Sequence, residues 1–211
     1  MIRIADNTDK SNKDFFLGLV RNLVPVTEHE SEKIEACLET RIIPAGNFLL
    51  RDSQPCHFWA FVSSGLVRVF SYDHTGKEHT NWFVREGELL TEFVSFFSAE
   101  ANSLENMVTL EDTTLVCIRL EKLNQLMNES MSFDRFCRLV YQNKLIELKR
   151  NILHRIREDA PGRYLYFSAH YPELLRRVPL KYIASNLNMT DSSLSRIRRL
   201  LVRRDSRSFL P

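Results

Sequence analysis

The sequence has few of the features that mark membrane, secreted or metal-binding proteins. No run of eighteen or more apolar residues occurs among its 211 residues, which argues against a membrane-spanning helix. The first sixteen residues, MIRIADNTDKSNKDFF, lack an apolar signal core, so we expect a cytoplasmic protein without a membrane partner. Hydrophobic residues make up 44% of the chain and charged residues 27%, as in a globular protein rather than a disordered one.

Cysteine is scarce and scattered, which argues against both a disulfide framework and a structural metal site. The four cysteines are Cys37, Cys56, Cys117 and Cys137, and none of them belongs to a C-x-x-C pair. The six histidines show no ligand spacing, and Cys56-His57 is the only adjacent pair of soft ligands. We expect buried or inert thiols and no metal.

Signatures of common catalytic sites are also missing. The sequence contains no G-x-x-x-x-G-K-[ST] phosphate loop, no G-x-S-x-G nucleophile elbow and no H-E-x-x-H zinc helix. No cofactor is evident. An enzyme is therefore the least favoured of three function classes, after a DNA-binding regulator and a ligand-binding module whose helical tail contacts other proteins.

Charge is distributed unevenly along the chain although the net charge is only +2. Residues 150–211 carry 13 Lys or Arg and 5 Asp or Glu, a balance of +8. Residues 1–149 carry the other 16 basic and 22 acidic groups, a balance of −6. A basic end on an acidic body suggests that the C-terminal part meets a polyanion, although a solvated basic surface would give the same count.

Patterns of apolar residues divide the first 130 residues into helices and then strands. An amphipathic segment at about 14–38 is interrupted at Pro25, and Thr27 with Glu30 has the spacing of a helix capping box. From about Ile42, short runs rich in aromatic and β-branched residues alternate with turns, including Asp73 to Gly76 as a hairpin turn. Strands at this spacing are typical of a sandwich or barrel.

A long helix is predicted next, from about 133 to 158, because this stretch contains neither proline nor glycine. One apolar stripe with a period of 3.6 residues should pack on the barrel. It consists of Phe133, Phe136, Cys137, Val140, Tyr141, Leu145, Leu148, Ile152 and Ile156. A second stripe, Leu139, Ile146 and Leu153, repeats every seven residues with Asn143 between, and it predicts a partner helix in a homodimer. A core helix of a monomer is the alternative. Ala160-Pro161-Gly162 is interpreted as the end of this helix and the domain boundary.

The stretch VPLKYIASNLNMTDSSLSRIRRLL, residues 178–201, predicts a helix-turn-helix. Its first helix has an apolar face that includes Ala184, which is small enough for a close helix crossing. Asn188 tolerates the left-handed backbone that the turn needs, and Thr190 is a good N-cap for the second helix. Leu194, Ile197 and Leu201 form the second helix's buried face.

The exposed face of the second helix suits the major groove of double-stranded DNA. Arginine can bond O6 and N7 of guanine together, and small hydroxyl groups fit between base edges. The candidate DNA contacts are Thr190, Asp191, Ser192, Ser193, Ser195, Arg196 and Arg199, with Arg198, Arg203 and Arg204 as phosphate contacts. A capped helix hairpin with a basic surface also occurs in proteins that do not bind DNA.

These motifs resemble those of the cyclic-AMP receptor protein and fumarate-nitrate regulator (Crp/Fnr) family over nearly the whole chain. The segment FVSSGLVRVFSYDHTGKEHTNWFVREGELLTE is similar to the family's strand, glycine, hairpin and G-[DE]-x-x-x-E elements. The I-A-x-x-L-x-M-[ST]-x-x-x-[LV]-S-R-I-R-R pattern is similar to its DNA-binding domain. By position, Asp191, Ser192 and Arg196 would then be the recognition contacts.

The resemblance implies an α+β protein in three parts. These are a double-stranded β-helix sensor domain (jelly roll) at 1–130, a dimerisation helix at 131–159 and a winged-helix-type helix-turn-helix domain at 160–211. Only ten residues follow Leu201, so we expect a reduced or absent wing. It also implies a homodimer on a pseudo-palindromic operator, with RNA polymerase as a candidate partner.

The sequence departs from the cyclic-AMP-binding members at the effector site. Those members place an arginine about ten residues after the glutamate that is Glu92 here, but that position holds Asn102 or Ser103. The candidate effector-pocket residues are therefore Glu92, Phe93, Asn102 and Ser103. We therefore predict an unidentified small-molecule effector other than cyclic AMP. The clustered N-terminal cysteines of the iron–sulfur members are missing as well.

Overall fold

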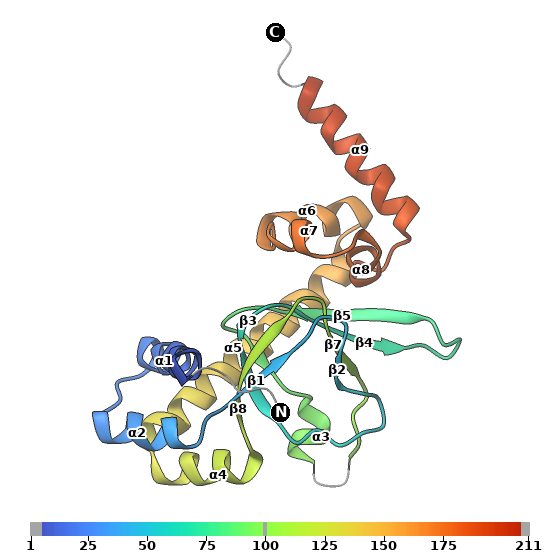
Figure 1. Cartoon of the computed structure of the whole chain (residues 1–211). Helices are drawn as coiled ribbons and strands as arrows, with labels where there is room; N and C mark the ends of the chain where they lie inside the picture. The colour runs from blue at the N-terminus through green and yellow to red at the C-terminus, as the bar shows by residue number, and fades with distance from the viewer. Residues whose placement is uncertain (1–5, 99–100, 208–211) are drawn as a thin grey trace. The chain divides into compact units, whose positions relative to one another are not determined.

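The computed structural model describes residues 6–98 and 101–207, with side chains described for residues 8–98 and 101–201. Figure 1 shows the path of the chain. The elements are α1 Asp6–Leu23, α2 Glu28–Ala36, β1 Glu39–Ile43, β2 Phe48–Leu50, β3 Trp59–Ser64, β4 Val67–Tyr72, β5 Glu78–Val84, β6 Leu89–Leu90, α3 Phe93–Phe97, β7 Asn106–Thr109, β8 Thr113–Ile118, α4 Leu120–Glu129, α5 Met131–Arg157, α6 Ala160–His170, α7 Leu174–Arg177, α8 Leu180–Asn186 and α9 Asp191–Arg207.

The strands form two four-stranded sheets, in the orders β1-β8-β3-β6 and β2-β7-β4-β5. The assigned pairings are antiparallel, as where Trp59 and Phe61 of β3 lie opposite Ile118 and Val116 of β8. Neighbours in the sheets are mostly distant in sequence, because the chain winds around the barrel instead of forming consecutive hairpins. The α+β class and the jelly-roll barrel predicted from the sequence are confirmed.

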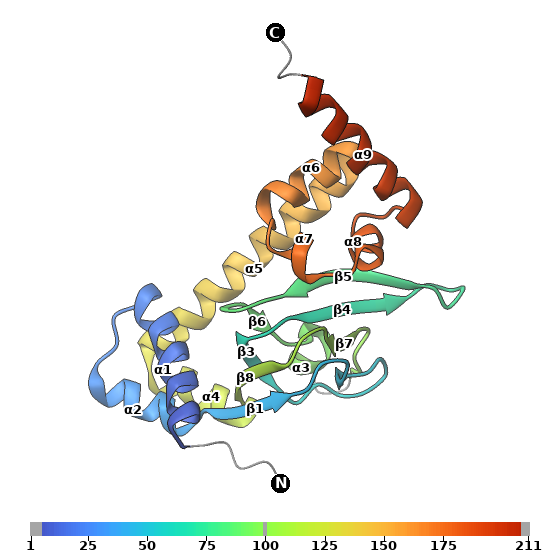
Figure 2. The same cartoon turned by 45° about the horizontal axis from the view of Figure 1, so that its top comes forward.

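An aromatic cluster fixes the helices α1 and α5 to the first sheet. Phe16 of α1 packs edge-on against Trp59, with ring centroids 6.2 Å apart, and against Phe136 of α5 at 5.8 Å. Phe133 of α5 lies 6.4 Å from the same tryptophan ring. All four side chains are completely buried. Figure 2 shows α1, α2, α4 and the first turns of α5 gathered at one end of the strands.

Gly65, between β3 and β4, has no room for a side chain. Its φ is +100°, and a Cβ there would lie 2.5 Å from Thr113 Oγ1 and 2.6 Å from the Asp112 carbonyl oxygen. Gly65→Ala is expected to destabilise the protein by about 2–5 kcal/mol, from strain and overpacking together. This should lower the melting temperature in calorimetry by roughly 5–15 °C.

Gly18 in α1 provides the matched control. A Cβ there meets nothing within 4 Å, and the glycine lies in a helix. Gly18→Ala should leave the melting temperature unchanged or raise it, because alanine is favoured over glycine in helices by about 1 kcal/mol. Equal melting temperatures for the two variants would contradict the steric account.

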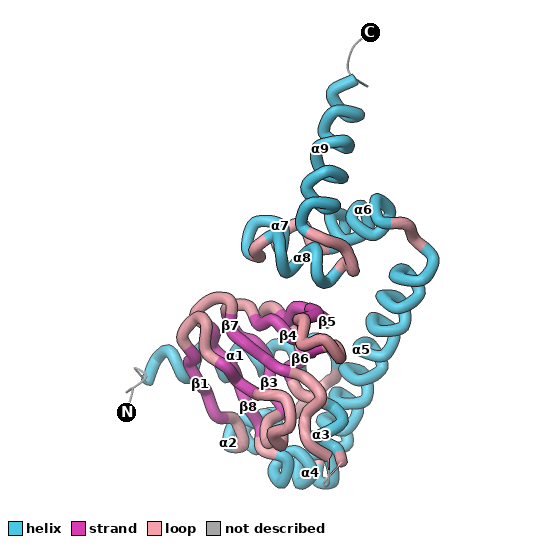
Figure 3. The backbone as a smooth tube through the Cα atoms, turned by 90° about the vertical axis from the view of Figure 1, so that its right-hand side faces the viewer, coloured by secondary structure: helices cyan, strands magenta, loops and turns pink. Residues whose placement is uncertain are grey.

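The chain divides into two compact units. The first contains residues 1–71 and 82–144, and the second contains Tyr72–Asn81 together with Leu145–Pro211. The division falls inside α5 and inside the β4–β5 hairpin, so the hairpin tip belongs with the C-terminal helices. Figure 3 shows those helices, α6 to α9, as one group.

The prediction that Ala160-Pro161-Gly162 ends a helix is wrong, because these residues begin one. α5 ends at Arg157, and α6 starts at Ala160 with proline in its first turn. Asp159 is the N-cap, and its carboxylate accepts a hydrogen bond from the Gly162 amide. Proline is tolerated there because its missing amide hydrogen would have had no partner within the helix.

Candidate functional site

The helix-turn-helix predicted from the sequence is present. α8 and α9 are joined by a tight turn in which Asn188 has a φ of +53°. The amide of Met189 donates to the Ala184 carbonyl oxygen at 3.0 Å, which closes the end of α8. This local geometry follows from one residue that tolerates the left-handed conformation at the required position.

Thr190 caps α9 as predicted. Its hydroxyl oxygen accepts a hydrogen bond from the Ser193 amide at 3.2 Å and lies 3.0 Å from the Ser192 hydroxyl. The Thr190 hydroxyl in turn donates to the Ser193 hydroxyl oxygen at 2.9 Å. Asp191 lies in the first turn, where the helix dipole favours a negative charge. The hydroxyl groups of Thr190 and Ser193 therefore stabilise the start of α9. Both residues were predicted from the sequence as DNA contacts.

The predicted apolar faces of α8 and α9 pack together, and this orients the remaining side chains outward. The buried residues are Ile183, Ala184, Leu187, Leu194 and Ile197. Leu201 is only half-buried.

On α9, Asp191, Ser192, Arg196, Arg198 and Arg199 are exposed, and Ser193 and Ser195 are half-buried. Arg199 Nε donates to the Ser195 carbonyl oxygen of the preceding turn at 3.3 Å. The side chains of Arg203 and Arg204 lie outside the described residues. The start of α9 thus presents hydroxyl groups, a carboxylate and guanidinium groups to solvent.

Two arginines that contributed to the basic charge count have structural roles instead. Arg163 donates to the Leu187 carbonyl oxygen at 2.8 Å and to the Glu158 carbonyl oxygen at 2.9 Å, which fastens the helix-turn-helix to the end of α5. Arg155 donates to the Asn81 carbonyl oxygen at 2.8 Å. Burial, together with the charge of Arg163, lowers the pKa of Arg155. Sequence reasoning missed both roles because each bonds to distant backbone.

The wing was expected to be reduced or absent, and α9 continues as a helix to Arg207. Within the described part of the chain, no strand follows β8.

The exposed face of α5 is broader than the predicted dimer stripe. Ile146 is 48% exposed and Asn143 is exposed, whereas Leu139 and Leu153 are half-buried. Leu145, Ile152 and Ile156 are 67%, 57% and 75% exposed, so the prediction that they pack on the barrel is wrong. The barrel-facing stripe ends near Tyr141, since α5 continues into the second unit. At 3.6 residues per turn, Leu145, Ile152 and Ile156 lie on one line along the helix, and Ile146 lies beside them on the flank that also carries Leu139 and Leu153.

Glu92, a candidate effector residue, is buried and caps α3. Its carboxylate accepts from the Ser95 amide at 2.6 Å and from the Val94 amide at 3.2 Å. The Ser95 hydroxyl in turn accepts from the Cys56 amide at 2.8 Å. The amides that begin α3 therefore already hold the protein's own carboxylate.

The other effector candidates make local contacts of their own. Asn102 is exposed, and Ser103 is buried with its hydroxyl bonded to Glu105. Phe93 stacks on Phe97, with centroids 6.1 Å apart, and packs edge-on against Tyr141.

The thiols fit the prediction that they are buried or inert. Cys56, Cys117 and Cys137 are buried, Cys37 is half-buried, and all four are free. Burial raises the pKa of Cys117 to about 11 and that of Cys137 to about 12. In residues 6–98 and 101–207, no three His, Cys, Asp or Glu side chains are grouped as metal ligands would be. No helix in these ranges has the length and apolar character of a membrane span.

Comparison with known proteins gives one family match and several structures of the same fold. Residues 40–130 match the cyclic nucleotide-binding domain family. No curated protein sequence matches the chain closely enough to count as a relative.

Solved structures with the same fold include FixK2 from Bradyrhizobium japonicum, with a TM-score of 0.66, 14% identity, and coverage of 80% of this chain and 86% of that one. The c-di-GMP responsive global regulator CLP from Xanthomonas campestris has a TM-score of 0.66 and 20% identity, covering 85% of this chain and 93% of that one. A protein from Eubacterium rectale described as a transcriptional regulator of the crp/fnr family has a TM-score of 0.63 and 15% identity. The match covers 84% of this chain and 85% of that one. The chain therefore resembles the cyclic nucleotide-binding domain family over residues 40–130 and shares the fold of these solved structures.

Proposed function

We propose that this protein is a homodimeric transcription regulator of the Crp/Fnr type that binds DNA in a sequence-specific manner, and not an enzyme. The observation that carries the proposal is the start of α9. The apolar side of this helix is buried against α8, while Asp191, Ser192 and Arg196 are exposed together. Side chains at the start of a recognition helix are the ones that reach base edges in the major groove.

The exposed apolar face of α5 supports the homodimer. Leu145, Ile146, Ile152 and Ile156 would remain in water in a monomer, and a continuous apolar stripe of this size marks an interaction site. A second α5 helix offers the same stripe, as a two-fold interface requires. Leu139, Asn143 and Leu153 would flank this interface. Two helix-turn-helix units in a dimer imply a pseudo-palindromic operator with half-sites about 34–36 Å apart.

A gel-shift experiment with the DNA upstream of the protein's own gene tests the DNA-binding function. The expected result is a discrete complex that survives an excess of unrelated DNA at fixed salt, because specific binding exceeds non-specific binding by about a thousandfold or more. Weak binding without sequence preference would instead favour a ligand-binding module whose C-terminal helices contact proteins.

For the effector, we propose a small molecule other than cyclic AMP that binds the sensor domain. No Lys or Arg occurs between Glu86 and Ile118, a stretch that carries seven acidic residues. A phosphate near these carboxylates would lack the charge-assisted bonds that offset its desolvation. The helix-end amides that could replace a cation are bonded to Glu92. The fold does not imply cyclic AMP, since CLP is described as responsive to c-di-GMP. RNA polymerase is the further partner that a regulator would contact.

Isothermal titration calorimetry of the full chain with cyclic AMP is expected to detect no micromolar binding. Asn102→Arg supplies the missing cation at an exposed position, so this variant should bind cyclic AMP more tightly than the unaltered chain. Micromolar affinity of the unaltered chain would overturn the charge argument.

A further inference from the structure

The outer edge of β5 is covered by side chains of the helix-turn-helix. β5 is the terminal strand of its sheet, so no other strand of the described residues lies beside its outer edge. Exposed strand edges carry backbone groups that need other partners. In the second unit these partners come from Ser185 and Asn186, the last two residues of α8.

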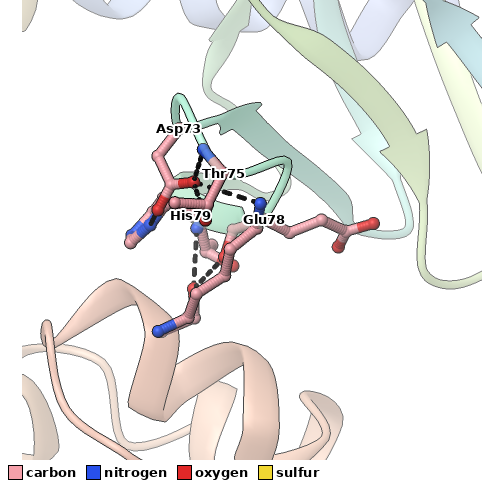
Figure 4. Close-up of polar contacts among 7 residues, drawn as sticks. Asp73, Thr75, Glu78 and His79 are labelled. Atoms are coloured by element: carbon pink, nitrogen blue, oxygen red, sulfur yellow. Dashed lines mark hydrogen bonds and ion pairs between the residues drawn. The ribbon is translucent and has the colours of Figure 1, made fainter.

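The Ser185 hydroxyl forms hydrogen bonds with one backbone donor and one backbone acceptor of β5. Its hydroxyl oxygen accepts from the Thr80 amide at 2.9 Å, and the hydroxyl donates to the Glu78 carbonyl oxygen at 3.3 Å. Figure 4 shows Glu78 among the polar contacts of the hairpin.

Asn186 holds the next part of the strand. Its Nδ2 donates to the Asn81 carbonyl oxygen at 2.9 Å and to the Thr80 carbonyl oxygen at 3.3 Å. Arg155 of α5 donates to the same Asn81 oxygen. We name the contacts of Ser185 and Asn186 with residues 78–81 the hairpin clamp.

The hairpin tip is internally braced, which makes it a suitable support. Asp73 Oδ1 accepts from the Thr75 amide at 2.8 Å, the Thr75 hydroxyl at 2.6 Å and the Lys77 amide at 3.1 Å. Asp73 Oδ2 lies 2.8 Å from His79 Nε2 (Figure 4). These hydrogen bonds hold the pKa of Asp73 well below its usual range, so the carboxylate is charged at neutral pH.

We propose that Ser185 and Asn186 are positioning residues that fasten the helix-turn-helix to the β4–β5 hairpin, so that the orientation of α9 follows the hairpin. The clamp residues directly precede the turn that leads to Thr190 and α9, and α8 packs on α9 through its buried apolar face. The strands of the hairpin continue covalently into the sensor unit. The hairpin therefore provides a second connection between sensor and DNA reader, in addition to α5.

The clamp is also weak enough to be reversible. Each neutral hydrogen bond changes an equilibrium by only about two- to tenfold, because water competes for both groups. Its role in DNA binding rests on the proposed function, but the contact itself can be tested without DNA.

Hydrogen exchange of the full chain tests the contact. In a variant with Ser185→Ala and Asn186→Ala, the Thr80 amide should exchange at least about tenfold faster. Ser185→Thr, which keeps the hydroxyl, should retain most of the protection when Asn186 is unaltered. Ser168→Ala is the control, since that hydroxyl bonds only to Leu165 within α6 in the described contacts. Unchanged exchange at Thr80 in a folded double variant would overturn the proposal.

Operator binding by the same variants tests the positioning role. A helix-turn-helix that has lost one of its two connections is less pre-organised, so the double variant should bind operator about three- to tenfold more weakly. Its preference for operator over random DNA should not change, since no base-reading residue is altered. Unchanged or tighter binding would contradict the positioning role, whereas absent selectivity in the unaltered protein would contradict the proposed function instead.

Discussion

A protein with Ile152→Glu is expected to sediment as a monomer at micromolar concentrations at which the unaltered chain sediments as a dimer. Ile152 lies on the exposed apolar face of α5 with Leu145 and Ile156. In a two-fold dimer, the change places a carboxylate from each partner in the same apolar interface. Burying a charge without a partner costs several kcal/mol, so the dissociation constant should rise by about a hundredfold or more.

Leu165→Glu is the matched control for this experiment. Leu165 is 50% exposed, similar to Ile152, but it lies on α6. Sedimentation velocity over a concentration series should show this variant as a dimer. If the unaltered chain is monomeric at micromolar concentrations, or if Ile152→Glu remains dimeric, α5 is not the dimer interface.

Arg196→Ala is expected to reduce discrimination between operator and random DNA much more than it reduces DNA binding as such. Arg196 is exposed next to the buried Ile197, about a turn and a half after the Thr190 cap. At that depth a guanidinium group can reach a base edge. Loss of a bidentate contact to guanine costs about 1–3 kcal/mol per half-site, which over two half-sites lowers the specificity ratio by at least about thirtyfold.

Arg198→Ala separates base reading from phosphate binding. Arg198 is exposed as well, and we assign it to the DNA backbone. Its loss should weaken binding to all sequences alike and reduce the salt dependence. Fluorescence anisotropy with operator and scrambled duplexes at several salt concentrations distinguishes the two patterns. A full specificity ratio for the Arg196 variant would show that α9 is not the reader.

The helix-turn-helix could be predicted from the sequence because its determinants are local. The cap at Thr190, the left-handed Asn188 and the apolar spacing of α9 each depend on residues within a few positions. The capping box of Thr27 and Glu30 was predictable for the same reason. Local hydrogen bonds and backbone preferences act before any tertiary contact forms, so they can be read from one stretch of chain.

Other features could not be predicted from the sequence. They depend on contacts between residues far apart in the chain, or on which of two apolar stripes of α5 is buried. Periodicity alone could not show where α5 leaves the barrel, so Leu145 and Ile156 were placed on the wrong face. Ser185 bonds to backbone more than a hundred residues away, where any residue type presents the same groups. Glu92 was predicted to lie in the effector pocket, and nothing in the sequence indicated that its carboxylate caps its own helix.

Selection of binding sites from a random double-stranded DNA pool tests the central claim most directly, because it requires no knowledge of the target genes. The full chain is expected to enrich a two-fold symmetric sequence whose half-sites are centred about 10–10.5 base pairs apart, or a multiple of that spacing. Arg196→Ala should relax the preference at one base pair in each half-site. Recovery of pools without a shared sequence, at a salt concentration where non-specific binding is weak, would contradict the claim that this protein is a sequence-specific regulator.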